Sequence, residues 1–288
     1  MEQQDLYQSA AELISEADAL LIGAGAGMGV DSGLPDFRGN EGFWKAYPFL
    51  AKARIAFTEV ANPHVLERDP ALGWGFYGHR LALYRRTVPH EGFQILRQWA
   101  GKMPLGARIF TSNVDGQFQK AGFSESQIHE CHGSLHYLQC MHGCGAGVWS
   151  ADSFIPEVDE ANCRLLNTMP VCPHCGELAR PNVLMFEDLL WRPERSEAQQ
   201  REEQAWINHL ARAKAKVVVV ELGAGSAIPT VRHFSSYISR ECYVRVIRIN
   251  LRESEVSHHH DVGIPEGALR ALRGIDAALN GPSHDHAL

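Results

Sequence analysis

The 288-residue sequence has no apolar run that approaches the roughly 20 residues needed to cross a bilayer. It also has no excess of positive charge, because 34 acidic side chains outnumber 27 basic ones and give a formal net charge of −7. That balance argues against a protein that holds duplex nucleic acid through phosphate contacts. Residues 1–21 are acidic and patterned like a helix, unlike a secretory signal. We therefore expect a cytoplasmic protein with no membrane partner.

A disulfide framework is not expected either, because the seven cysteines are odd in number and no export signal accompanies them. Four of them form two close pairs: Cys140 with Cys144, and Cys172 with Cys175. Cysteines three or four residues apart can occupy neighbouring corners of a tetrahedron, so the two pairs predict a closed, structural four-thiolate Zn²⁺ site. Two alternatives are that some are ordinary buried thiols, and that His142 or His174 replaces one ligand.

Short apolar runs alternate with helical patterns along the chain. Runs that look like buried strands lie at 19–22, 107–111, 217–221 and 244–249. Apolar residues at helical spacing occupy 5–17 and 93–99, and 191–213 looks like a charged surface helix. This alternation predicts an α/β fold, with a Rossmann-like parallel sheet that helices cover on both faces.

Two segments differ from this pattern and predict a smaller lobe. Residues 41–89 are rich in aromatic side chains and His without a strand signal, and 137–176 are rich in cysteine and glycine. We expect these two segments to form a helical and zinc-binding lobe. The remaining segments, 1–40, 90–136 and 177–288, would then form the Rossmann-like domain.

A glycine-rich turn at 23–27 follows the first apolar run. Glycines let the backbone approach a pyrophosphate, and the N-terminus of a following helix favours the anion. A hydride-transferring dehydrogenase would add an acidic residue about 20 positions further on, at the end of a second strand. Here the turn runs instead into 32–39, a loop that could close over the ribose and phosphates of a nucleotide. The alternative is a structural turn pinned by Asp36 and Arg38.

Several motifs in this order resemble those of the sirtuins. Residues 25–38 resemble their NAD-binding signature, 111–115 their second motif and His132 with Gly133 their third. The zinc cysteines follow, and 180–186 resemble the substrate-lining segment. The resemblance runs from about residue 10 to 255. It implies that the larger domain binds NAD⁺, that a structural zinc holds the smaller one, and that substrate enters the cleft between them.

The resemblance also implies roles for individual residues. Sirtuins break the nicotinamide–ribose bond of NAD⁺, usually to remove an acyl group from lysine. His132 would be the base that activates a ribose hydroxyl, Asn113 would orient the ribose or a water, and Asp115 would hold the nicotinamide side. An Asn and an Asp after a strand can also be simple turn formers. The other cofactor-binding residues implied are Gly25, Ala26, Gly27, Asp36, Phe37, Arg38, Ser112, Gly223, Ala224, Gly225 and Asn250. Substrate would meet Val183, Leu184 and Phe186.

Three segments depart from the usual sirtuin pattern. At position 112 the sequence has Ser where typical sirtuins have Gln. Positions 187 and 188 are Glu-Asp where the usual pattern is Gly-Glu, and residues 221–229 replace the usual Gly-Thr-Ser-Leu stretch. These departures resemble the macrodomain-linked bacterial class, which is associated with protein mono-ADP-ribosylation and lacks the catalytic His. This sequence keeps His132. We therefore expect an NAD-dependent protein-lysine deacylase. The alternatives are a mono-ADP-ribosyltransferase, whose partner is an ADP-ribose-accepting protein, and a non-catalytic NAD or ADP-ribose sensor.

Tyr77 and Arg80 bear on the acyl group. The two are three residues apart and share one face if their segment is helical. They resemble the Tyr and Arg of deacylases that accept succinyl- or malonyl-lysine, where a guanidinium pairs with the distal carboxylate. The alternative is an ordinary surface pair.

Overall fold

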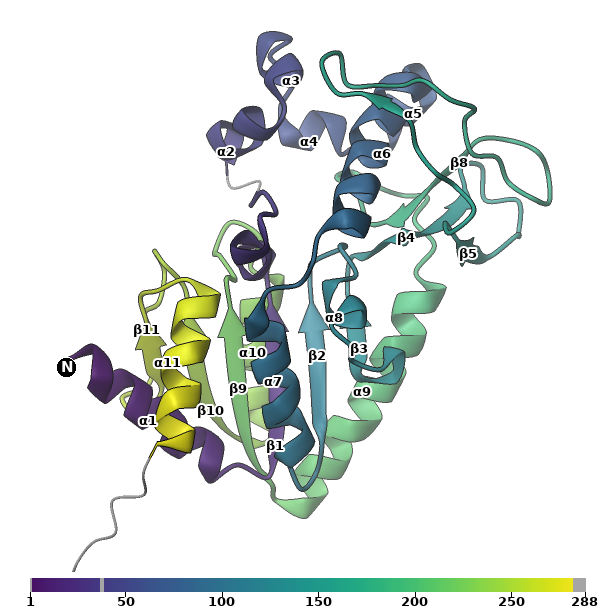
Figure 1. Ribbon diagram of the computed structural model, residues 1–288. Coiled ribbons are helices and arrows are strands. Elements are labelled where there is room, and N and C mark those ends of the chain that lie inside the picture. Colours follow the sequence, from purple (N-terminus) through teal and green to yellow (C-terminus); the bar gives the residue numbers. More distant parts are fainter. Residues whose placement is uncertain (1, 37–38, 282–288) are drawn as a thin grey trace, which may run out of the picture.

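The computed structural model describes residues 2–36 and 39–281, which form a six-stranded layer and a smaller part at one end of it (Figure 1). The α-helices are α1 (Gln3–Ser15), α2 (Gly39–Ala46), α3 (Pro48–Lys52), α4 (Phe57–Val60), α5 (Pro63–Arg68), α6 (Pro70–Arg86), α7 (Glu91–Lys102), α8 (Gln117–Lys120), α9 (Glu194–Ala213), α10 (Thr230–Glu241) and α11 (Ala268–Asn280). Two 3₁₀ helices occupy Ala26–Ser32 and Glu125–Gln127.

The strands are β1 (Ala19–Ala24), β2 (Ala107–Thr111), β3 (Ile128–Glu130), β4 (Gly133–Cys140), β5 (Val148–Ser150), β6 (Val158–Asp159), β7 (Arg164–Leu165), β8 (Ala179–Val183), β9 (Lys216–Leu222), β10 (Tyr243–Ile249) and β11 (Val262–Ile264). Six of them form one sheet in the order β11-β10-β9-β1-β2-β3, and every neighbouring pair is parallel. The four strands predicted from apolar runs are its centre. The predicted α/β fold is thus confirmed.

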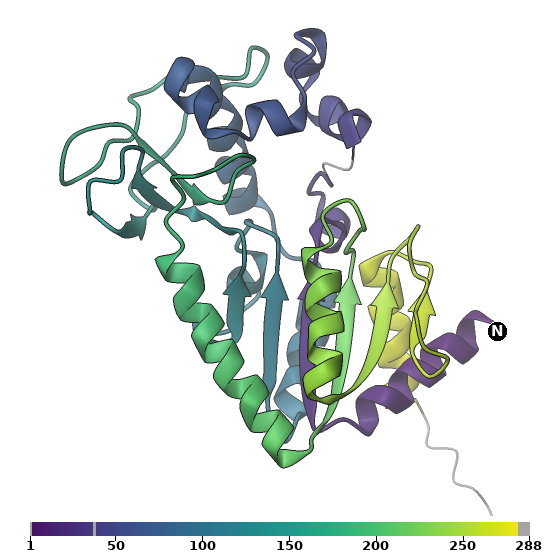
Figure 2. The ribbon, with the colours of Figure 1, turned by 180° about the vertical axis from the view of Figure 1, so that it is seen from behind.

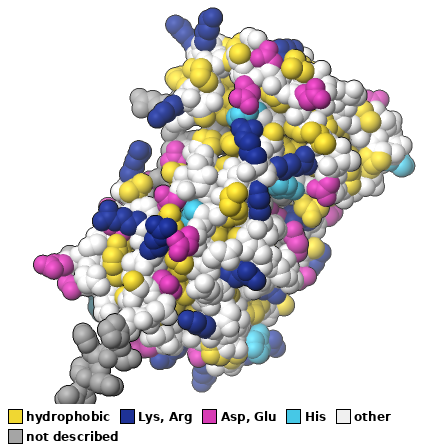
Figure 3. All heavy atoms as spheres, in the orientation of Figure 1, with side chains coloured by type: hydrophobic (Ala, Val, Ile, Leu, Met, Phe, Trp, Pro, Cys, Tyr) yellow, Lys and Arg dark blue, Asp and Glu magenta, His cyan; other side chains and the backbone are white. Residues whose placement is uncertain are grey.

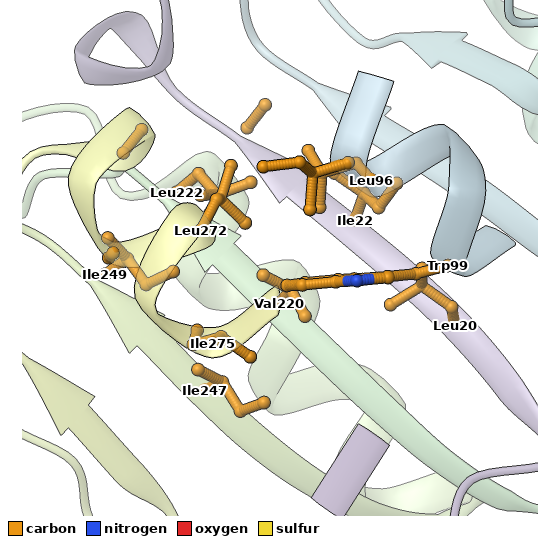
Figure 4. Close-up of a cluster of buried hydrophobic side chains, with 14 of the residues drawn as sticks. Leu20, Ile22, Leu96, Trp99, Val220, Leu222, Ile247, Ile249, Leu272 and Ile275 are labelled. Atoms are coloured by element: carbon orange, nitrogen blue, oxygen red, sulfur yellow. The ribbon is translucent and has the colours of Figure 1, made fainter. Parts of the chain in front are cut away.

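Successive residues of the central strands point to opposite faces of this sheet, and they are apolar on both. Helices therefore cover both faces. On β1, Leu20 and Ile22 face α1, α7 and α11, and Figure 4 shows them packed with Trp99 and with residues of α11. Leu21, between them, belongs to the cluster under α9 and α10 on the opposite face, seen in Figure 2. Each of these side chains is almost fully buried, and each burial contributes about 2 kcal/mol to stability.

Helix α9 is a charged helix at the surface, as expected, but part of it is buried. Ser196 and Glu203 are only 6% and 2% exposed. His129 on β3 accounts for this, because its Nδ1 lies 2.7 Å from a Glu203 carboxylate oxygen and its Nε2 lies 3.3 Å from the Ser196 hydroxyl. The helix is therefore docked on the sheet partly through polar groups.

The smaller part has its own sheet and core. Strands β5, β4 and β8 form an antiparallel sheet in that order, and helix α6 packs against it. Helices α2 to α5 extend from α6 (Figure 1) and contribute to the same hydrophobic core. Helix α6 is tied to β8 by Trp74, whose indole N–H donates to the Ala179 carbonyl at 3.0 Å. This sheet uses residues on both sides of the boundaries expected at 136 and 177, and the division into domains stays a prediction.

Two properties of the described residues bear on location and surface. Within residues 2–36 and 39–281, no helix combines the length and the apolar character that a membrane crossing needs. On the face shown in Figure 3, basic and acidic side chains are interspersed. This face therefore presents charges of both signs.

Candidate active site

A pocket of about 660 Å³ lies where the six-stranded sheet meets the smaller part. Strands β1, β2 and β9 all end at this edge (Figure 1), which is where parallel sheets usually bind ligands. The pocket gathers most of the predicted site residues, and those that line it are Gly25, Ala26, Asp36, Tyr77, Arg80, Ser112, Asn113, Asp115, His132, Val183, Leu184, Phe186, Gly223, Ala224 and Gly225.

Among the described residues, two predicted cofactor-binding residues are not in that lining. Gly27 lies just behind it, where its N–H donates to the Gly223 carbonyl at 3.1 Å. Asn250 is buried, and its side chain donates to Ala224 O at 2.9 Å and accepts from the next loop. Phe37 and Arg38 fall outside the described residues. The cofactor-binding roles of all four stay predictions.

Two glycine-rich segments form one end of the pocket, and their backbones touch. A Cβ on Gly25 would lie 2.8 Å from the Ala224 Cα atom. A Cβ on Gly223, whose φ is +59°, would lie 2.4 Å from Gly27. Side chains are excluded there, so bare backbone faces the pocket directly before the helix Ala26–Ser32. Such a cradle fits the pyrophosphate of a dinucleotide such as NAD⁺.

The loop after β2 is fixed to the same glycine segment. Asn113 donates from its side-chain amide to the Gly25 carbonyl at 3.0 Å, and its backbone N–H donates to the Thr111 hydroxyl at 3.0 Å. Asp115 accepts from the Gln117 N–H at 2.9 Å. These bonds hold both residues at the pocket wall, and their roles toward a ligand stay predictions.

The pocket contains two titratable groups with displaced pKa values. Burial raises the pKa of Asp115 to about 6. Burial also lowers the pKa of His132 below its ordinary value, and its Nε2 lies 3.4 Å from the Thr230 hydroxyl. A neutral imidazole at neutral pH is able to accept a proton. The pair is thus suited to proton transfer beside a bound ligand.

Tyr77 and Arg80 lie on α6, so they share a helix as the spacing predicts. They are 1% and 7% exposed and both line the pocket, so the alternative of a surface pair is wrong. The Arg80 guanidinium donates to the Tyr84 hydroxyl from Nε at 3.0 Å and from Nη2 at 2.7 Å. This places a cationic side chain in the pocket wall.

A buried ion pair shapes the substrate-lining segment. Arg180 and Asp188 have fully buried side chains and form a bidentate pair. Asp188 also accepts from the Met185 N–H at 3.2 Å. Between them, Glu187 has a φ of +55°, a backbone region that favours glycine. The departure from Gly-Glu therefore places an exposed carboxylate on a strained backbone position, next in sequence to the pocket residue Phe186.

The four predicted zinc ligands come together at the end of β4. Their sulfur atoms all lie within 4.8 Å of one another, with Cys140 Sγ 3.6 Å from Cys175 Sγ and Cys144 Sγ 3.4 Å from Cys172 Sγ. Zn–S bonds of about 2.3 Å in a tetrahedron put sulfurs about 3.8 Å apart, so the cluster fits Zn²⁺. Within the described residues the candidate set contains no His, as a four-thiolate site predicts.

Some lining residues were missed at the level of sequence. Tyr84, Arg252 and Glu253 all line the pocket. None belongs to a motif with recognisable chemistry. Glu253 is placed by the fold, since its carboxylate accepts from the Ser226 N–H at 2.9 Å across two loops.

Comparisons with known proteins agree with this geometry. Residues 25–208 match the model of the Sir2 family. This chain belongs to the Sir2 family. Among its Sir2 relatives, the NAD-dependent protein deacylase of Thermococcus kodakarensis is 30% identical, with 94% of this chain and 97% of the relative covered. The NAD-dependent protein deacylase of Pyrococcus furiosus is 29% identical, with 85% and 87% covered.

The solved structures support the same assignment. A crystal structure of a Sir2 homologue in complex with NAD matches with a TM-score of 0.67 and 25% identity, and the match covers 94% of each chain. The predicted sirtuin resemblance is thus confirmed.

Proposed function

We propose that this Sir2-family protein is an NAD-dependent protein-lysine deacylase. The observation that carries the proposal is that His132, Asn113 and Asp115 line one pocket with a backbone cradle that two glycine-rich segments form. Relatives that bear the name NAD-dependent protein deacylase support it. The partner would be an acylated protein, and we place the enzyme in the cytoplasm. The NAD-binding part would comprise 1–40, 90–136 and 177–288, with 41–89 and 137–176 as the smaller lobe.

When bound, NAD⁺ would supply a nicotinamide–ribose bond, which breaks as the acyl oxygen of the substrate bonds to the ribose carbon. Gly25, Ala26 and the 223–225 segment would hold its phosphates through backbone groups. Asn113 would orient the ribose, and Asp115 would bind the nicotinamide side. His132 would accept a proton at Nε2 from a ribose hydroxyl, which a neutral ring permits. Val183, Leu184 and Phe186 would exclude water around the acyl-lysine.

The zinc site would act by stabilising the smaller part. Four thiolates leave no open position on the ion for a catalytic water. The cluster would therefore hold β4, which starts directly after His132, and so support the pocket without taking part in a chemical step.

Arg80 favours a second candidate for the acyl group. A buried guanidinium in the wall of the pocket is suited to an acyl chain that ends in a carboxylate. An Arg80→Met enzyme would then lose activity on succinyl-lysine by about tenfold or more, while activity on acetyl-lysine would change much less. Equal losses on both peptides would contradict a role in acyl choice.

The test of function is mass spectrometry on the protein with NAD⁺ and a panel of acylated lysine peptides. A deacylase yields free lysine together with acyl-ADP-ribose. ADP-ribose attached to a protein side chain, without deacylation, would instead establish the transferase alternative. Binding of NAD⁺ with no product of either kind would establish the sensor.

A further inference from the structure

Strand β4 connects the proposed catalytic centre with the zinc cluster, and its pairing is irregular in the middle. It begins at Gly133, directly after His132, and ends at the ligand Cys140. Its register against β8 shifts between Ser134 and Leu138. Irregularities of this kind re-aim side chains and occur often beside active sites.

The irregular residues bind the loop that carries Asp115. The Leu135 N–H donates to the Val114 carbonyl at 3.0 Å. The His136 Nε2 lies 3.0 Å from the Asp115 carbonyl oxygen. A carbonyl only accepts, so Nε2 carries the proton and donates. Two consecutive residues of β4 thus hold two consecutive carbonyls of the loop.

The His136 ring also packs against the next residue of the loop. Gly116 has a φ of +67°, and a Cβ there would lie 2.7 Å from both Cδ2 and Nε2 of the ring. Only a glycine lets the ring come close enough to bond the Asp115 carbonyl. The contact and the hydrogen bond together fix the orientation of the peptide between Asp115 and Gly116.

We propose that His136 is a positioning residue for Asp115, which it directs into the 660 Å³ pocket through the Asp115 carbonyl. The inference rests on the proposed function, because that function is what assigns Asp115 to the nicotinamide side of NAD⁺. His136 itself does not line the NAD pocket. It acts on the ligand only through the backbone of Asp115.

A second cavity explains why Asp115 needs a positioning residue. A polar pocket of about 340 Å³ lies behind the loop, and both His136 and Asp115 line it. Asp115 therefore stands between two cavities. The carboxyl receives a hydrogen bond from Gln117 of its own loop, so the orientation of the loop backbone decides which cavity it faces. The hydrogen bond from His136 selects the larger, less polar one.

The charges around the Asp115 carboxyl make its orientation measurable. Glu130 raises its pKa and Arg80 lowers it, both less than burial does. The second cavity is lined by charged groups of both signs, which are Arg85, Lys120, Glu125 and Asp152. A carboxyl turned toward that cavity would meet a more polar lining, which penalises the charged form less, and its pKa would fall toward the ordinary value of about 4.

The experiment compares His136→Gln with His136→Asn. The amide nitrogen of Gln reaches the position of the imidazole Nε2, whereas that of Asn is too short, so the pair differs in the reach of one donor. The pKa of Asp115 is followed by carbon-13 NMR in the protein without NAD⁺. The KM for NAD⁺, kcat, zinc content and melting temperature are measured alongside. His64→Gln, at an exposed histidine, is the matched control.

We expect His136→Asn to lower the pKa of Asp115 by one unit or more and to raise the KM for NAD⁺ about tenfold, since one hydrogen bond is lost. The KM for the peptide and the zinc content should not change. His136→Gln and His64→Gln should stay within about threefold of the wild-type KM. If His136→Asn does not fold, His136→Met, which keeps the length without the donor, takes its place.

An equal Asp115 pKa and an equal KM for NAD⁺ in the Gln and Asn variants would overturn the proposal, because packing alone would then explain the presence of His136. An unchanged pKa of Asp115 in His136→Asn would overturn it as well. The NMR readout needs no turnover, so it separates this inference from the function. A protein without deacylase activity whose Asp115 pKa still responds as expected would contradict the proposed function and support the positioning role.

Discussion

Strands β1 and β8 are both buried along their whole length, yet they are stabilised in opposite ways. β1 is Ala-Leu-Leu-Ile-Gly-Ala and packs apolar side chains on both faces of the large sheet. β8 is Ala-Arg-Pro-Asn-Val, and two of its side chains need buried polar partners, Arg180 with Asp188 and Asn182 with Gln139. The comparison indicates that β1 is stabilised by hydrophobic burial on both faces, whereas β8 also needs buried polar partners and pairs with the strand that ends at the zinc cluster.

The largest effect should come from removing the metal. Cys172→Ala leaves an incomplete ligand set, and structural Zn²⁺ contributes on the order of 10 kcal/mol to folding in small zinc domains. We expect β4, β5 and β8 to lose protection in hydrogen exchange while β1 and β9 keep theirs. Cys242→Ala, at a cysteine outside the cluster, is the control. Protection retained in β4 and β8 would show that the smaller part does not depend on the metal.

A smaller effect should follow from a cavity in the large sheet. Leu20→Ala removes a side chain with no exposure, and such changes cost about 3 kcal/mol. Chemical denaturation should show this loss of unfolding free energy, with zinc content unchanged. A variant that also releases zinc would contradict separate sources of stability in the two parts.

The smallest effect concerns Asp115, which lies where the two parts meet. Its pKa of about 6 in the folded chain exceeds the ordinary value of 3.8, so the folded state binds the proton more tightly. The favourable contribution is complete below about pH 4 and is lost as the pH rises through 6. Asp115→Asn should therefore raise the unfolding free energy at pH 8 by at most about 3 kcal/mol.

The same measurement at pH 3 is the control for Asp115, because the carboxyl is then largely neutral in both the folded and the unfolded chain and the gain should nearly disappear. A stabilisation that does not change with pH would contradict the burial of a charged carboxyl. If Asp115→Asn loses activity while its unfolding free energy rises, the carboxyl at position 115 serves function at a cost in stability.

The contrast between β1 and β8 also explains which strands can be predicted from the sequence. Apolar runs predicted β1, β2, β9 and β10, because burial against neighbouring layers needs only local composition. β3 and β11 have three residues each, too few for a periodic signal. β8 was missed because Arg and Asn are buried only where partners lie nearby in space. Such partners are not readable from the sequence.

The site divides in a similar way. Asn113, Asp115, His132 and the zinc cysteines belong to motifs with fixed spacing. The structure brings the first three into one pocket and the four cysteine sulfurs into one cluster. His136 had no such signal, because its partner is the backbone of a residue 21 positions away. Glu203 looked like a solvent-facing charge on α9, yet its partner His129 lies 74 positions earlier. Groups that act on backbone or on distant side chains become visible only in the fold.

The most direct test of the central claim is single-turnover deacylation by His132→Ala, with NAD⁺ affinity measured on the same preparation. If His132 is the base of an NAD-dependent deacylase, the rate should fall by about a hundredfold or more, and NAD⁺ affinity should stay within a few-fold. Deacylation at the wild-type rate would contradict the account, because the pocket would then work without the imidazole.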